Sequence, residues 1–346
     1  MATINPSQSY DVIHTLTFTS VSGTLGIYLI RGASDPFSGT VYYRYGTTGS
    51  WTSLSVSGTS TTIPISSATV QIAHDWNKSG NDYMTPSFGN GTNNPTTISM
   101  SQKSPITGGI GTGFFYKYAR KCSNLISLDV PNTTGATYTG SNFMGYYANE
   151  CSSLTSLDVP DTSSMTSCLS YFMYLYASNS PSIETLEVPD TSNMVTVGNN
   201  FLSGYALNCS SIKKLKNVDT EMVTSIGNNF MNNFAQGCSS LLEMYVPDTS
   251  KMTTVGTDIM KNFANGTYSL LKLFLPNTTG WFTTNNVDWS VPLARLGLLK
   301  GYVKTPSAKT AWEALTVSGK TLYTNRIRST SDVILDISEI FRRRLL

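Results

Sequence analysis

The stretch at residues 151–162 reads CSSLTSLDVPDT, and its pattern returns along the chain at a constant interval. Its first position recurs every 29 residues, at Cys122, Cys151, Ser180, Cys209, Cys238 and Thr267. A proline closes most of these copies, at Pro131, Pro160, Pro189, Pro247 and Pro276. A fixed period of roughly 20–50 residues is typical of a solenoid, in which stacked copies bury one continuous core.

Each copy has two apolar halves. Leu128 and Val130 are two residues apart, so they face the same side of a short strand. The other half carries apolar side chains at offsets 0, 1, 4, 5 and 8, as at Phe143, Met144, Tyr147, Ala148 and Cys151. These offsets form one stripe of an α-helix, for which Asn142, Asn200 and Asn229 are the expected N-caps. The copy is therefore predicted to be strand, turn and short helix, with stacked strands forming a parallel sheet.

The repeats are flanked by two unlike regions. Residues 1–97 contain short stretches rich in Val, Ile, Thr, Tyr and Trp between Gly, Ser and Asn turns, which favours an antiparallel sandwich or small barrel. We expect an attachment module at 1–97, a solenoid at 98–306 and a C-terminal cap and tail at 307–346. A seventh, degraded copy is expected where Leu299 and Tyr302 fall 29 residues after Leu270 and Leu273.

The motif F-x-x-x-[Y/F]-A-x-x-C-S-S-L-x-x-L-x-V-P, over residues 111–280, resembles the BspA-like class of leucine-rich repeats. The residue patterns and this resemblance together predict a mixed fold, in which an antiparallel β-sandwich-like domain precedes an α/β leucine-rich-repeat solenoid with a parallel sheet and a C-terminal cap. The resemblance implies extracellular adhesion or display, because members of that family are mostly bacterial or protist surface proteins that bind host or matrix proteins. It carries over no individual binding residue, because the family has no fixed site.

The composition restricts the partners. Charged residues make up 13% of the chain, against roughly 25% in an average soluble domain, and a surface built from Ser, Thr, Asn, Gly and Tyr suits a secreted or virion protein. The net charge of +2 without a basic stripe argues against nucleic acid. The opening residues lack the pattern of a secretory signal peptide, and no apolar run of about 18 residues predicts membrane insertion.

The residues that could carry chemistry are few. His14 and His74 have no nucleophile motif near them, so we expect structural roles. The repeated cysteines lie on the buried stripe and are expected to be small packing residues, with a disulfide between neighbouring copies as the alternative. Without a C-x-x-C pair, zinc is not expected. We therefore predict no catalytic residue, no metal and no cofactor.

Binding residues are expected on the outward side of the predicted strands, where packing does not dictate the side chain. The two outward columns hold the candidates Asp129, Asp158, Glu187, Lys214, Lys216, Glu243, Tyr245, Lys272 and Phe274. Their chemistry changes along the solenoid from acidic, through basic, to aromatic. The alternative is ordinary solvated variation, with the aromatic pair covered by the C-terminal cap.

Two further features have competing interpretations. An Asp or Asn comes directly after the proline position of each copy, which favours Asx turns over a calcium ladder or an ice-binding threonine array. These residues are Asn132, Asp161, Asp190, Asp219, Asp248 and Asn277. The C-terminal stretch predicts an amphipathic basic helix over 332–346, which docks into a partner subunit or packs on the last coil. The residues expected to dock are Ile337, Phe341, Arg342, Arg343 and Arg344.

These expectations together describe a non-enzymatic display or adhesion protein. The missing signal peptide and the exterior-type composition favour a phage virion component, a fibre or capsid-surface protein. Such a protein would bind a host surface protein or glycan, contact other virion subunits and form a homo-oligomer. The alternative is a BspA-like adhesin that is secreted or on the bacterial cell surface. A remote alternative is a carbohydrate-active enzyme that uses the carboxylates of Asp129, Asp158 and Glu187.

Overall fold

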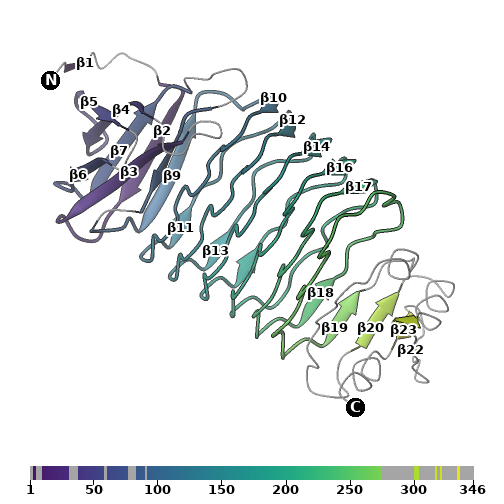
Figure 1. Cartoon of the computed structure of the whole chain (residues 1–346). Coiled ribbons are helices and arrows are strands. Elements are labelled where there is room, and N and C mark those ends of the chain that lie inside the picture. Colours follow the sequence, from purple (N-terminus) through teal and green to yellow (C-terminus); the bar gives the residue numbers. More distant parts are fainter. Residues whose placement is uncertain are drawn as a thin grey trace.

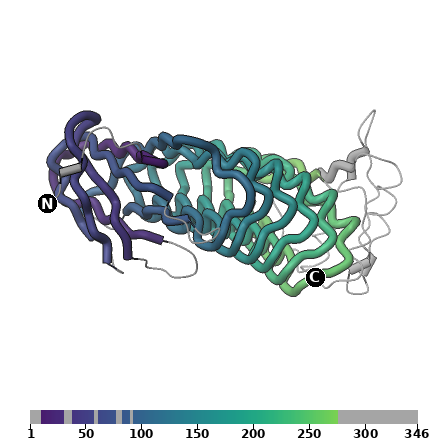
Figure 2. The backbone as a smooth tube through the Cα atoms, turned by 90° about the horizontal axis from the view of Figure 1, so that it is seen from above, coloured from purple at the N-terminus to yellow at the C-terminus, as the bar shows by residue number. Residues whose placement is uncertain are grey.

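The protein consists of an N-terminal β-domain followed by a stack of similar turns (Figure 1). The computed structural model describes residues 10–30, 38–57, 61–76, 83–89 and 92–274, and short strands at 3–4, 300–303, 316–317, 320–321 and 333–335. Within these residues, every regular element is a β-strand. Seen from above, the turns lie side by side as open loops of similar outline (Figure 2).

The N-terminal domain consists of two sheets that share one core. The larger sheet has, in order, β1 (Thr3–Ile4), β5 (Trp51–Val56), β4 (Gly39–Tyr45), β7 (Thr69–His74), β2 (Val12–Thr17), β9 (Thr97–Gln102) and β11 (Ser127–Leu128). The smaller sheet has β6 (Thr61–Pro64), β3 (Thr24–Ile30) and β8 (Thr85–Phe88). Apart from the β9–β11 pair, all of these pairings are antiparallel, as the strand pattern predicted.

Strand β9 joins the domain to the solenoid. It pairs antiparallel with β2 on one side and parallel with β11 on the other. The sheet of the domain therefore continues into the first solenoid strand, and one hydrophobic cluster runs from Val12 to Leu273. The domain limits expected from the sequence remain predictions.

Two sides of the solenoid are built from short parallel strands, with an isolated bridge in place of a strand at Lys214 and at Thr254. One side forms a sheet of β10 (Gly108–Ile110), β12 (Ala136–Thr139), β14 (Ser167–Cys168), β16 (Thr196–Val197) and β17 (Ser225–Ile226). The other side has β11, β13 (Ser156–Leu157), β15 (Thr185–Leu186), β18 (Glu243–Tyr245) and β19 (Lys272–Phe274). Equivalent residues pair directly, as Leu157 does with Leu186. The predicted parallel strands with inward leucines are thus confirmed.

The third side of each turn, which carries the repeated Phe, Tyr, Ala and Cys positions, is not the predicted helix. Over residues 97–274, which are all described, the structure has no helix. Instead, every second residue adopts a left-handed backbone, with φ of 61°, 50° and 56° at Asn142, Met144 and Tyr146. The N–H groups of Tyr146 and Ala148 donate to carbonyls of the next turn at 2.7 and 2.8 Å. Hydrogen bonds therefore join neighbouring turns, whereas a helix would bond within itself.

The spacing of the turns explains why a helix is excluded. The rings of Tyr147, Tyr176 and Tyr205 stack on one another with centroids 5.3 Å apart. An α-helix with its side chains is about 10–12 Å across, so helices cannot stack at this interval. The apolar stripe is buried as expected, but its residues lie on a non-helical backbone and not on a helix. The α/β leucine-rich-repeat part of the expected fold is therefore wrong, and the described solenoid is entirely β.

The same geometry reassigns the asparagines that were expected to be helix N-caps. Asn142, Asn200 and Asn229 have φ of 61°, 58° and 57°. Left-handed backbone costs an ordinary L-residue about 1–2 kcal/mol, and Gly and Asn tolerate it best. Gly or Asn also occupies other left-handed positions, at Gly113, Gly204, Asn208, Asn233, Gly237, Asn262 and Gly266. The recurrence of these residues is thus explained by backbone conformation.

The C-terminal strands continue the sheet of β19. Strand β20 (Lys300–Val303) pairs parallel with β19, so a parallel strand is present where the seventh copy was expected, but Tyr302 lies opposite Phe274, not opposite Leu273 as expected. Strand β23 (Val333–Leu335) pairs antiparallel with β20, so these residues are not part of the predicted helix. A hairpin of β21 (Thr316–Val317) and β22 (Lys320–Thr321) is also described. The expected docking residues Ile337, Phe341, Arg342, Arg343 and Arg344 lie outside the described residues.

Substitution of Asn233 tests the left-handed third side. In a helix interior, Ala is about 1 kcal/mol better than Gly. At the observed φ of 55° the order reverses, and Asn233→Gly should be more stable than Asn233→Ala by about 1 kcal/mol. Both variants lose the bond from the Asn262 amide, so their difference reports the backbone alone. Urea unfolding of both proteins measures it, and a more stable Ala variant would contradict the structure.

Candidate functional site

The two histidines form a buried hydrogen-bonded pair where the β-domain meets the solenoid. Their Nε2 atoms are 3.0 Å apart, and both side chains are fully buried. The Tyr118 hydroxyl of the first turn lies 2.7 Å from His14 Nδ1, and His74 Nδ1 lies 3.1 Å from the Asp75 carbonyl. Two neutral rings satisfy the whole chain, because Tyr118 then donates to His14, His14 to His74, and His74 to the carbonyl.

Burial controls the protonation of this pair. It lowers the pKa of His74 to about 4, and it lowers the pKa of His14 well below 6.5, with His74 as a second cause. A charged ring would have to give up the bond that its unprotonated nitrogen accepts. The pair therefore acts as a neutral link between the domain and the first turn.

The histidine pair predicts acid sensitivity. The unfolded chain binds protons below its ordinary histidine pKa of 6.5, whereas folded His74 binds one only near pH 4. Stability is therefore complete above about pH 6.5 and falls as the pH drops toward 4, by on the order of 3 kcal/mol for His74. Urea unfolding of the wild type and of His74→Gln at several pH values measures this loss. Equal slopes against pH in the two proteins would contradict it.

The repeated cysteines are buried thiols that are not joined in disulfides. The Sγ atoms of Cys151, Cys209 and Cys238 each donate to an alanine carbonyl of the preceding turn at 3.1, 3.0 and 3.0 Å. The Ser180 hydroxyl makes the equivalent bond at 2.9 Å, which explains why Ser can replace Cys. Burial raises the pKa of Cys151 and Cys209 to about 12, so both are held as unreactive thiols. The disulfide alternative is therefore not realised.

The Asp and Thr side chains of the repeated turns form hydrogen bonds that stabilise the backbone. The Asp161 carboxylate accepts the N–H of Ser163 at 3.0 Å and its hydroxyl at 2.6 Å, and these bonds lower the pKa of Asp161. The Thr162 hydroxyl donates to the Asp190 carbonyl of the next turn at 2.7 Å. The predicted Asx turns are thus present. Among the described residues, no three His, Cys, Asp or Glu side chains gather as a metal site.

The predicted binding residues do lie on the outward side of the strands, but most of their charges are already engaged there. Lys216 pairs with Glu187 of the preceding turn at 2.5 Å. Glu243 lies between Lys272 at 2.5 Å and Lys214 at 3.3 Å, and these ammonium groups lower its pKa. These ion pairs join neighbouring turns, so the charges serve stacking as well as any ligand.

We term this outward side of the strands β11, β13, β15, β18 and β19 the strand face. Its remaining candidates are an aromatic pair and two aspartates. Tyr245 and Phe274 stack with centroids 4.3 Å apart and planes 12° apart, and both are half-buried. The Asp129 carboxylate accepts the N–H of Met100 in β9 at 2.9 Å. Asp158 is exposed one turn further on. The stacked pair is therefore the most distinctive feature of this face.

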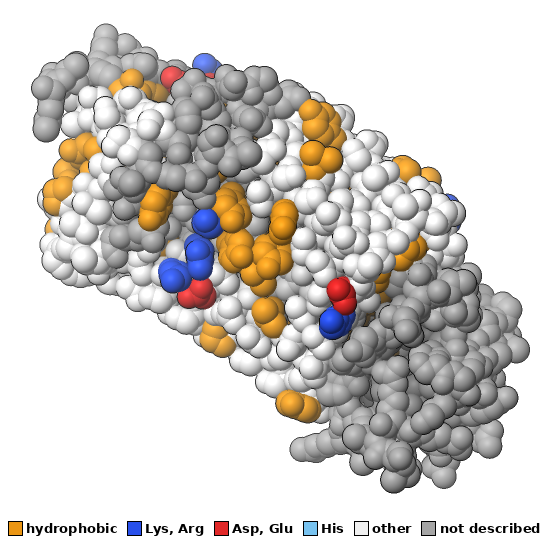
Figure 3. Space-filling model, in the orientation of Figure 1, with side chains coloured by type: hydrophobic (Ala, Val, Ile, Leu, Met, Phe, Trp, Pro, Cys, Tyr) orange, Lys and Arg blue, Asp and Glu red, His pale blue; other side chains and the backbone are white. Residues whose placement is uncertain are grey.

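A second surface, on the third side of the turns, was missed from the sequence. Figure 3 shows hydrophobic side chains gathered beside Lys or Arg groups and a carboxylate on the face it draws. On the third side, Tyr116 contacts Tyr146, and Tyr146 contacts Tyr174, with ring centroids 5.8 and 5.3 Å apart. The three tyrosines occupy two different repeat positions, because the position of Tyr116 and Tyr174 holds Gly145 in the turn between. A search along constant columns therefore does not find them.

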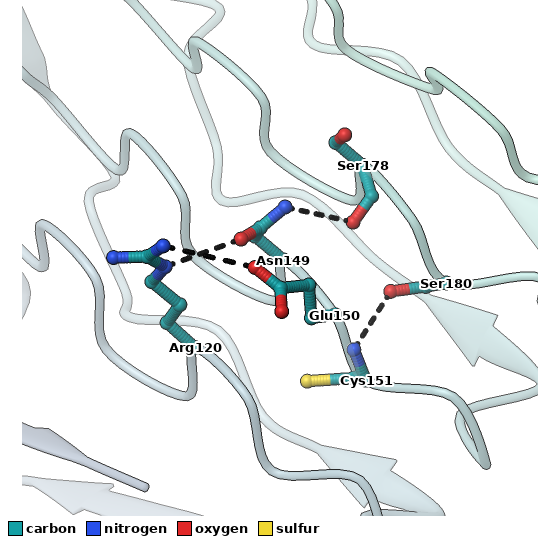
Figure 4. Close-up of polar contacts among 6 residues, drawn as sticks. All are labelled: Arg120, Asn149, Glu150, Cys151, Ser178 and Ser180. Carbon is teal, nitrogen blue, oxygen red and sulfur yellow. Dashed lines mark hydrogen bonds and ion pairs between the residues drawn. The ribbon is translucent and has the colours of Figure 1, made fainter. Parts of the chain in front are cut away.

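Arg120 is fixed at the edge of this surface. Its Nε donates to the Asn149 side chain at 3.3 Å, and one terminal nitrogen lies 3.7 Å from the Glu150 carboxylate (Figure 4). Asn149 in turn donates to the Ser178 carbonyl at 3.0 Å. Arg120 also lies over the Tyr146 ring, 5.2 Å from its centroid. The guanidinium is thus held by three contacts before any ligand arrives.

No protein-family model matches the chain, and no curated protein and no solved structure was found to be similar to it. The BspA-like resemblance therefore rests on the motif alone, and the helical half that it implied is absent from residues 97–274. In the part of the chain that the structure describes, no apolar helix long enough to span a membrane occurs.

Proposed function

We propose that this chain is a non-enzymatic display protein, in which the solenoid holds binding residues at fixed positions on a rod. The observation that carries the proposal is the single core from Val12 to Leu273, which joins the β-domain to the turns. Hydrogen bonds between neighbouring turns fix the spacing of outward side chains. Outward positions can then vary without loss of the fold, as the charges and aromatics of the strand face do.

The strand face is the proposed site for a ligand on a cell surface, a protein or a glycan. The stacked Tyr245 and Phe274 supply an aromatic anchor, and Lys272 and Glu243 supply charges beside it. Aromatic residues are enriched among the side chains that carry most of the energy of a protein interface. The described rod would present this anchor near its C-terminal end, opposite the β-domain (Figure 1).

The location on a phage virion remains our proposal, and a bacterial surface adhesin is the alternative. It is supported by the surface composition, with only 13% charged residues. A fibre or capsid-surface protein would contact other virion subunits and further copies of itself. Mass spectrometry of purified particles from a source that encodes the chain tests this, and absence from the particles would exclude it.

The enzymatic alternative is less well supported. A glycosidase would need two cooperating carboxylates, but Asp129 accepts a backbone N–H and Glu187 pairs with Lys216. Turnover of a glycan panel that disappears in Asp158→Asn would reverse this preference.

The double variant Tyr245→Ala, Phe274→Ala should weaken binding to cells by at least about tenfold, because loss of a central anchor typically costs about 2 kcal/mol or more. The measurement is binding of the labelled full chain to a panel of whole bacterial cells by flow cytometry. The control is Thr196→Ala, Thr254→Ala, which changes exposed residues of another side. Equal binding by a folded double variant would exclude this face, and no binding by the wild type would contradict the display proposal.

A further inference from the structure

Four tyrosines on the third side of the solenoid form one connected group, which we term the tyrosine row: Tyr116, Tyr146, Tyr171 and Tyr174. Tyr171 contacts Tyr174 with centroids 5.4 Å apart and planes at 77°. The rings of the row meet edge to face, which is a favourable arrangement for aromatic pairs. They are separate from the buried tyrosine stack of Tyr118, Tyr147, Tyr176 and Tyr205.

The packing of the core does not account for the row. Tyr171 is 39% exposed, and Tyr116, Tyr146 and Tyr174 are only partly buried. Gly145 leaves room for the Tyr116 ring, since a Cβ at that glycine would lie 3.2 Å from it. Burial and the neighbouring tyrosines, including a hydrogen bond with Tyr146, raise the pKa of Tyr174 to about 12, so its phenol stays protonated. The row therefore presents ring surface and hydroxyl groups together.

One end of the row is basic. Lys117 lies over the Tyr116 ring at 4.6 Å, and Arg120 lies over Tyr146 at 5.2 Å. Lys121, the next residue along the chain from Arg120, is exposed, and the described carboxylate at this edge is Glu150, 3.7 Å from Arg120. Three cations against one carboxylate leave a local positive charge, which favours an anionic group. The other end of the row, at Tyr171 and Tyr174, is aromatic.

The dimensions favour a short linear ligand. The steps of 5.8 and 5.3 Å from Tyr116 to Tyr174 place the basic and aromatic ends about two turns apart. A standard protein interface covers about 800 Å² on each partner, whereas the row consists of four rings, three of which are only partly exposed. A sugar chain has apolar C–H faces that suit aromatic rings and hydroxyls that suit phenols. An acidic sugar also supplies the anion that the basic end requires.

We propose that the tyrosine row binds an acidic oligosaccharide, with its carboxylate or sulfate at Arg120 and Lys121 and a neighbouring sugar ring against Tyr171 and Tyr174. The sugar would lie along the solenoid axis and cross successive turns. This site is independent of the strand face, because its residues lie on a different side of each turn. It assigns a ligand class that the strand face does not define.

Calorimetric titration of the full chain tests the proposal with three probes: a short oligogalacturonate, a heparin oligosaccharide of similar length and a neutral oligogalactan. At least one acidic probe should bind at least tenfold more tightly than the neutral one. Comparison of the two acidic probes distinguishes a carboxylate from a sulfate as the recognised group. Arg120→Gln should weaken binding about tenfold or more, and Tyr171→Ala, Tyr174→Ala should do the same.

A second test variant and a neutral control separate ring contacts from general charge attraction. Tyr171→Ala alone changes an exposed ring, so it keeps the test valid if the double variant unfolds. Thr196→Ala, Thr254→Ala, which changes exposed residues outside both proposed binding faces, should leave the affinity for the acidic probe unchanged. The proposal is overturned by absence of binding, by equal binding of the neutral probe, or by unchanged affinity in a folded Tyr171 variant. Retention on a glutamate-rich peptide without glycan binding would also overturn it, in favour of an acidic protein partner.

Discussion

The structure depends on one constraint, which is that every turn lies about one strand spacing from the next on all of its sides. Equivalent rings stack at 5.2 to 5.4 Å along the Phe143, Phe172, Phe201 and Phe230 column. Each backbone group must then find its partner in the neighbouring turn or in a local turn. An α-helix is too wide for this spacing. The segment with helical periodicity therefore adopts a non-helical backbone that bonds to the neighbouring turns.

The same constraint selects the side chain of each buried polar column. Cys and Ser recur where a small side chain can donate to an alanine carbonyl one turn back. The hydroxyls of Tyr147 and Tyr176 donate to the carbonyls of Asp129 and Asp158 at 2.5 and 2.6 Å, which ties the third side to the strand side. These buried Cys, Ser and Tyr side chains therefore form hydrogen bonds with backbone carbonyls of a neighbouring turn, which lowers the free-energy cost of burying them.

Function is left to the outward positions, where the repeat is not regular. On the strand face, most of the charged side chains form ion pairs between neighbouring turns, and Tyr245 and Phe274 stack on each other. The third side carries the tyrosine row with a fixed arginine at its edge. Both surfaces consist of side chains whose spacing the rod determines, and they lie on different sides of each turn. A display protein with separate binding faces is the simplest account of this arrangement.

The sequence by itself determined the period, the inward Leu column, the parallel strands and the Asx turns, because each depends on local spacing and on contact with an identical neighbour. The third side was decided only by tertiary structure. Offsets 0, 1, 4, 5 and 8 suit a helix, but they equally suit a thin chain with alternate left-handed residues such as Asn142 and Met144. The tyrosine row was likewise hidden, since Tyr116 and Tyr146 occupy different repeat positions and meet only when the turns stack.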